Sequence, residues 1–173
     1  TVTLNQGDVL IVLSASGGGG PDLAAVTGTV VSSTSPVQVI GGHDCTDIPY
    51  NITWCDHIEE AVFPYETLSN KAILTSPWTS VNVVRPTVYR IVATQPNTTL
   101  TYDPPQPGAP TTIAAAGSYV ELSPTTASFQ VTANFKIITA QYMVGQAYGG
   151  GLSTSDPAMA QGVSVEQYRD KYL

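Results

Sequence analysis

Charged residues are scarce in this chain. Only 11% of its 173 residues are Asp, Glu, Lys or Arg, whereas soluble domains carry roughly 25%. Three lysines and three arginines stand against 13 acidic residues, which gives a formal net charge of -7 at pH 7. A chain this poor in cations lacks the basic surface by which proteins bind nucleic acid or anionic lipid. We therefore expect neither as a partner.

Long apolar runs are also missing. The longest, residues 9–13, has five residues, while a membrane-spanning helix needs about 20, so we expect no membrane span. Hydrophobic residues nevertheless make up 42% of the chain. This fraction excludes a disordered chain, because disorder combines low hydrophobicity with high charge.

β-Branched residues dominate what is present. Val, Ile and Thr together supply 51 residues. Their side chains pack well on a pleated sheet and lose little freedom in an extended backbone, so the composition predicts an all-β fold. The candidate strands are residues 9–13, 28–32, 37–40, 71–74, 81–84, 87–94, 98–102, 119–122, 129–132 and 136–143.

For some of these segments the sequence also predicts burial, pairing or helix. The apolar run 9–13 is typical of a strand buried on both faces. Residues 87–94 and 98–102, joined by Gln95-Pro96-Asn97, form the clearest predicted hairpin. Helix is expected only as one turn at 56–61 and as a short C-terminal helix at 164–172.

The strands repeat in order along the chain. Residues 7–12 parallel 117–122, residues 31–39 parallel 131–139, and residues 56–60 have a fainter echo in 165–168. A shared order at offsets near 100 residues indicates internal duplication. We predict a single domain, an antiparallel β-sandwich of two pseudo-repeated units (about 1–86 and 87–173) with Greek-key or hairpin connections. Part of a β-propeller or solenoid is the alternative.

Both ends of the chain fall inside a repeat unit, so that each terminal unit lacks a strand that its counterpart has. We therefore expect a fragment of a longer extracellular protein. Sheet edges left open at these ends would favour strand exchange with a neighbouring domain or with another copy.

Polar chemistry gathers around two cysteines. Both histidines, both cysteines and five acidic residues lie within residues 43–60. A disulfide between Cys45 and Cys55 is the interpretation we favour. The alternatives are a zinc site of His43, Cys45, Cys55 and His57, although His-x-Cys is tighter than usual zinc spacing, and a calcium site of the acids, although no EF-hand loop is present.

No catalytic constellation stands out. The Gly-x-Ser-x-Gly elbow of hydrolases is absent, and the four glycines at 17–20 are followed by Pro21-Asp22 rather than by the Lys-Ser/Thr of a phosphate loop. We expect no enzymatic activity and no cofactor. A metal-dependent carbohydrate-binding or hydrolytic module around His43, Asp44, Asp56 and His57 is the remaining alternative.

Aromatic residues suggest a binding surface instead. Trp54, Trp78 and nine tyrosines are amphipathic groups suited to contact surfaces. Trp78, Tyr142 and Tyr148 are the candidate binding residues. The competing interpretation is that the tyrosines are half-buried strand residues.

Several motifs carry a family resemblance. The segments Gly41-Gly42-His43-Asp44-Cys45, Cys55-Asp56-His57-Ile58-Glu59-Glu60 and Ala140-Gln141-Tyr142-Met143 resemble the N-terminal domain of the IgGFc-binding protein family. The likeness runs in order from about residue 7 to residue 172, and the glycine-rich insertion at 17–20 is typical of a bacterial member. It implies an extracellular, cysteine-bridged β module without catalytic residues, in a family named for binding antibody Fc.

These observations favour a secreted or cell-surface adhesion or protein-interaction module. Its expected partners are a protein or glycan ligand at a surface, or copies of itself. The alternative function is a structural segment of a surface fibre or sheath, assembled by strand or edge complementation.

Overall fold

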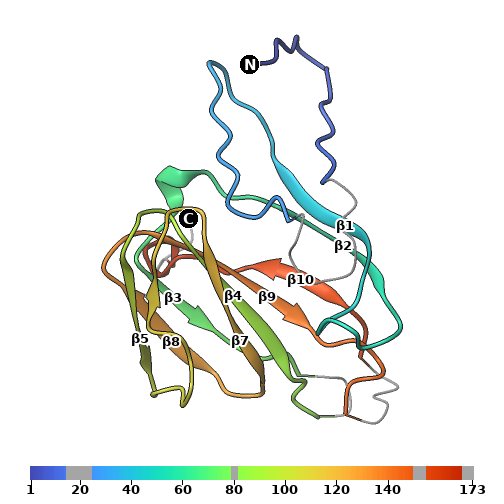
Figure 1. Ribbon diagram of the computed structural model, residues 1–173, viewed down its shortest axis with the longest axis vertical. Helices are drawn as coiled ribbons and strands as arrows, with labels where there is room; N and C mark the ends of the chain where they lie inside the picture. The colour runs from blue at the N-terminus through green and yellow to red at the C-terminus, as the bar shows by residue number, and fades with distance from the viewer. Residues whose placement is uncertain (15–24, 79–81, 150–154, 169–173) are drawn as a thin grey trace.

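The fold is all-β, as the composition predicts. The computed structural model describes residues 1–14, 25–78, 82–149 and 155–168. Within them lie ten strands and two 3-10 turns, η1 (Tyr65–Thr67) and η2 (Val165–Gln167). Every strand pair is antiparallel, and two four-stranded sheets form a sandwich (Figure 1). In the described part of the chain, no sheet closes into a barrel and the sheets do not form a propeller, so the propeller alternative is wrong.

The sheets of the sandwich are built from the second half of the chain plus one strand of the first. The first sheet has the order β10 (Ala158–Gln161), β9 (Ile137–Met143), β4 (Thr87–Ala93), β7 (Tyr119–Thr125). The second has the order β3 (Lys71–Leu74), β8 (Phe129–Ala133), β5 (Thr98–Asp103), β6 (Thr112–Ile113). A separate hairpin pairs β1 (Ile40–Thr46) with β2 (Asp56–Ala61).

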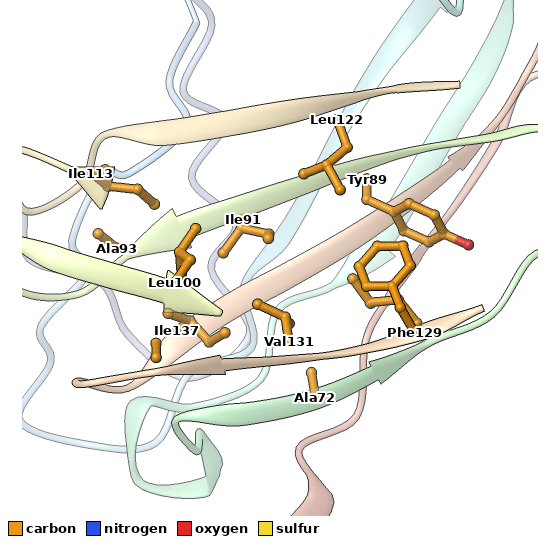
Figure 2. Packing of buried hydrophobic residues seen from close by; sticks show 12 residues of the cluster. Ala72, Tyr89, Ile91, Ala93, Leu100, Ile113, Leu122, Phe129, Val131 and Ile137 are labelled. Atoms are coloured by element: carbon orange, nitrogen blue, oxygen red, sulfur yellow. The ribbon is translucent and has the colours of Figure 1, made fainter. Parts of the chain in front are cut away.

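The core lies between the two sheets and is centred on β4. Because strand side chains alternate between faces, Tyr89, Ile91 and Ala93 all point inward, where they are at most 1% exposed. Figure 2 shows Tyr89 meeting Phe129 of the opposite sheet, with ring centroids 5.2 Å apart in an edge-to-face arrangement. The Tyr89 hydroxyl shares a hydrogen bond of 3.0 Å with Ser76 Oγ, which satisfies its polar end, and burial raises the pKa of this phenol.

The outward face of β4 is covered as well. Val88 packs with Ile48, Ile58 and Val144 in a second, smaller cluster, through which the β1–β2 hairpin sits on the first sheet. Both faces of β4 are therefore covered by other parts of the chain, as expected for a strand in the middle of a sheet that is packed on both sides.

Arg90 occupies the same outward face. Its Nε and Nη2 donate to Glu121 Oε1 at 2.9 and 2.6 Å, its Nη1 donates to Thr27 Oγ1 at 2.9 Å, and its guanidinium lies 4.1 Å from the ring centroid of Tyr119. Burial opposes the charge, yet the neighbouring Tyr142 and Glu121 outweigh it and raise the pKa of Arg90. These contacts tie the first half of the chain to the first sheet.

The predicted hairpin between 87–94 and 98–102 is wrong. β4 and β5 belong to opposite sheets, and the intervening turn carries the chain across the core. β4 instead pairs with β9 and β7, and this central position covers the side chains on both of its faces. Leu100 of β5, 2% exposed, then contributes to the same core from the other sheet.

Two predicted strands near the N-terminus are also wrong. Residues 9–13 have no strand pairing, and their side chains are 51–84% exposed instead of buried. Residues 28–32 are likewise unpaired, and of residues 37–40 only Ile40 belongs to a strand. The apolar pattern is present, but residues 9–13 and 28–32 belong to no sheet among the described residues.

The remaining local assignments differ in part. Residues 56–61 form β2 and not a helical turn, since pairing with β1 satisfies their backbone groups. Of the predicted helix at 164–172 only the 3-10 turn η2 forms, and residues 169–172 lie outside the described residues. Of the predicted strand 81–84, residue 81 lies outside the described residues. Residues 82–84 form no strand, and Val84 makes only an isolated bridge with Trp78. The glycines at 17–20 also lie outside it. No helix in the described ranges has the length and apolarity to cross a membrane.

The core packing gives a direct prediction. Leu74 is fully buried on β3, while its neighbour Ile73 is 42% exposed. Leu74→Ala should lower the free energy of unfolding by about 2–5 kcal/mol, because it removes buried methyl groups and leaves a cavity. Ile73→Ala is the matched control and should cost less than about 1 kcal/mol. Urea denaturation of both variants measures this, and equal losses would contradict the assignment of Leu74 to the core.

Candidate contact surface

Three connections meet at one end of the sandwich. We use the name loop end for their described residues: 47–55 between β1 and β2, 75–78 and 82–86 between β3 and β4, and 144–149 and 155–157 between β9 and β10. The pairing of Thr87 with Met143 places the start of β4 beside the end of β9. Gly145 N donates to Ile48 O at 2.7 Å, which ties the first loop to the third. The loop end lies at the lower right of Figure 1.

A disulfide closes the first of these loops. Cys45 and Cys55 are bonded, with their Cα atoms 5.1 Å apart, which confirms the favoured interpretation. The zinc alternative is wrong, because a tetrahedral Cys2His2 site needs both sulfurs as free thiolates.

The disulfide loop is anchored at one residue and exposed at others. Ile48 is 7% exposed and packs in the second cluster. Tyr50 and Trp54, in contrast, are 50% and 69% exposed. Trp54 has a φ of 72°, a left-handed conformation that a bulky residue adopts only when its surroundings impose it, and such residues cluster at functional sites. The loop therefore presents two aromatic side chains from a fixed backbone.

The histidines near the disulfide each pair with one neighbouring acid. His43 Nδ1 lies 3.2 Å from Asp44 Oδ1, and His57 Nε2 lies 3.5 Å from Glu59 Oε2, all on exposed side chains. No three His, Cys, Asp or Glu side chains are grouped for metal binding in the ranges that the structure describes. The arrangement thus gives no support to a calcium site or to a metal-dependent module at His43, Asp44, Asp56 and His57.

The three aromatic candidates differ in exposure. Trp78 is 68% exposed in the β3–β4 connection. Tyr142 and Tyr148 are half-buried and pack against the second cluster, and Tyr142 lies 5.5 Å from the Arg90 guanidinium. Trp78 is thus available for contact, whereas the two tyrosines have packing roles.

Tyr50 is a candidate that the sequence analysis missed, and Trp54 is one that it named without choosing. The signal that identifies both is their position inside a short ring closed by two cysteines. Such a ring is too small to enclose its own side chains, so most of them face solvent.

Two aspartates, Asp56 and Asp156, lie close together beside the loop end. Asp156, just before β10, lies near Asp56 at the start of β2; slight burial, the Asp56 charge and a hydrogen bond with Asp56 raise the pKa of Asp156. With Asp44 in β1 and Asp47 in the neighbouring loop, this region is acidic.

Comparison with known proteins places the chain in a family. A family model described as "IgGFc binding protein" matches residues 1–173, the whole chain. No curated protein and no solved structure matches. The chain belongs to the IgGFc binding protein family.

The disulfide predicts a loss of stability on reduction. Replacing both cysteines by serine should lower the free energy of unfolding by about 2.5–3 kcal/mol, from the added chain entropy of an unfolded state without its eleven-residue ring. Urea denaturation with and without dithiothreitol measures the effect. Reductant should destabilise the wild type and leave the double variant unchanged. Two free thiols in the unreduced wild type would contradict the bond.

The Asp56–Asp156 contact predicts a pH dependence. A raised pKa means that the folded state binds the Asp156 proton more tightly than the unfolded state, so this group lowers stability as the pH rises above the ordinary aspartate range. Asp156→Asn should raise the melting temperature slightly at pH 7, with a smaller gain at pH 3. Asp47→Asn removes the same charge from the loop end and serves as control. An equal gain at both pH values would count against the contact.

Proposed function

We propose that this member of the IgGFc binding protein family is an extracellular, non-catalytic protein-binding module whose contact surface is the loop end. The observation that carries the proposal is the pair of exposed aromatic residues, Tyr50 and Trp54, on a disulfide-closed loop that Ile48 anchors to the sandwich. Trp78, 68% exposed in the β3–β4 connection, is a further exposed aromatic residue of the loop end.

The physics of protein interfaces supports this surface. Tryptophan and tyrosine are enriched among the residues that contribute most to binding, since they bury much area with few rotatable bonds. A loop whose backbone is already fixed loses less entropy on binding. The disulfide and the 2.7 Å bond from Gly145 to Ile48 supply that rigidity.

The charge of the loop end favours a basic partner surface. Asp44 and Asp47 lie in or beside the disulfide loop, and Asp56 and Asp156 lie next to it. Charges at the rim of an interface act mainly on the association rate and are screened by salt. Binding should therefore slow as ionic strength rises.

An oxidising compartment fits the disulfide, because such bonds persist outside the cytosol. We accordingly place the module in a secreted or surface-exposed protein, where it serves adhesion. Immunoglobulin Fc is the first ligand to test because the family is named for it, and a surface glycoprotein is the second.

The experiment measures the binding of the wild type and of variants to immobilised Fc and to an immobilised surface glycoprotein. Trp54→Ala should raise the Kd for the bound ligand at least tenfold, and Trp78→Ala should raise it less. Phe135→Ala is the matched control: Phe135 is 41% exposed but lies in the β8–β9 turn at the opposite end of the sandwich.

The outcomes are distinct. Binding that survives Trp54→Ala and Tyr50→Ala, or that falls equally with Phe135→Ala, would refute the loop end as the contact surface. Binding of the wild type to neither ligand would reject both as partners.

A further inference from the structure

The two hairpins of the structure share one register. In β1–β2, Ile40 pairs with Ala61 and His43 with Ile58; in β9–β10, Ala140 pairs with Gln161 and Met143 with Ala158. The four consecutive pairs from Ile40–Ala61 to His43–Ile58 thus recur 100 residues later in the second hairpin. The correspondence continues beyond the strands, where Val62 N donates to Val39 O at 2.9 Å and Gly162 N donates to Thr139 O at 2.7 Å.

Neighbouring turns correspond as well. The 3-10 turns η1 and η2 are also 100 residues apart and follow the same hairpin. The turn closed by Asp8 N and Asn5 O (3.0 Å), with Gly7 at a φ of 90°, matches the turn closed by Ser118 N and Ala115 O (3.2 Å), with Gly117 at 78°. Residues 9–13 follow the first turn as β7 follows the second.

The two units differ at one place. In the second unit, β4 lies between β9 and β7 and pairs with both. In the first unit, β1 corresponds to β9 and residues 9–13 to β7, yet β1 pairs only with β2 among the described residues. Residues 9–13 expose their apolar side chains, including Val9 at 84% and Ile11 at 75%. No described strand fills the position that β4 fills in the second unit.

One strand of the first unit already belongs to a sheet of the second unit. β3 follows η1 of the first unit, but it pairs with β8 and so completes the second sheet of the sandwich. One unit therefore supplies a strand to the next, which is the arrangement called strand complementation.

We propose that the first unit is an acceptor for a β-strand that inserts between residues 9–13 and β1, and that the donor is the β4-type strand of another unit of this kind. The insertion would bury the exposed apolar side chains of residues 9–13 and satisfy the backbone groups of the open edge of β1.

The acceptor also selects the sequence of the donor. In the second unit, Arg90 of β4 is held by Glu121 and Tyr119. The corresponding residues of the first unit are Ile11 and Val9. An arginine buried beside them would have no carboxylate partner, which is costly. The donor strand therefore carries an apolar residue where β4 has Arg90.

Two peptides test this selection against the full chain. Both span residues 85–96 and carry fluorescein, one with the native sequence and the other with Arg90→Val. Fluorescence anisotropy should give the wild-type chain at least a tenfold lower Kd for the Arg90→Val peptide. Hydrogen exchange should then slow at residues 9–13 and 40–43.

A reciprocal variant makes the test independent of overall affinity. Ile11→Glu restores the carboxylate found at Glu121, and Ile11 is exposed, so the variant should fold. It should reverse the preference and bind the native Arg90 peptide more tightly. Val30→Glu is the control, because Val30, 84% exposed, corresponds to Gln130 on β8 in the other sheet, and it should leave the preference unchanged.

The contrary results are equally clear. Binding of neither peptide at concentrations up to about 100 µM, between the millimolar and micromolar ranges of affinity, would overturn the proposal. So would a preference that Ile11→Glu leaves unchanged, or a dimer of the free chain that protects residues 9–13 without any peptide, since that would make the occupant the same segment of a second copy.

Discussion

The burial of β4 on both faces is the constraint on which the rest of the structure depends. Its inward residues, Tyr89 and Ile91, form the centre of the core between the sheets. Its outward residues, Val88 and Arg90, contact the first half of the chain. A strand that is packed on both faces lies in the middle of a covered sheet, and β4 accordingly has β7 and β9 as its neighbours.

The loop end follows from the same arrangement. Since β4 starts where β9 ends, the connections on either side of these strands emerge together. The β1–β2 hairpin docks on the outward face of β4 through Ile48 and Ile58, and this docking brings the disulfide loop to the same place. Tyr50 and Trp54 are therefore presented by packing beneath them as much as by the disulfide itself.

The contrast between the two units has one physical origin. The second unit contains a central strand and buries its apolar residues, whereas residues 9–13 have the same kind of apolar side chains and remain exposed. Hydrophobic burial in a sheet requires neighbours for the backbone as well as a covering layer, because unpaired peptide groups are costly to bury. An apolar run without a partner strand is therefore left at the surface.

The sequence by itself determined the features that depend on local chemistry. β-Branched composition determined the all-β class, and the short separation of Cys45 and Cys55 allowed the disulfide. Strand β3 (Lys71–Leu74) was predicted with its observed bounds, since a short apolar run between turn residues needs no further information. Only the tertiary structure decided which strands pair, that residues 56–61 are a strand, that β4 and β5 lie in opposite sheets, and that Trp54 is exposed while Tyr142 is packed. Alternation along a strand indicates which faces are buried, but it does not identify the neighbouring strand, and contacts between distant segments decide that.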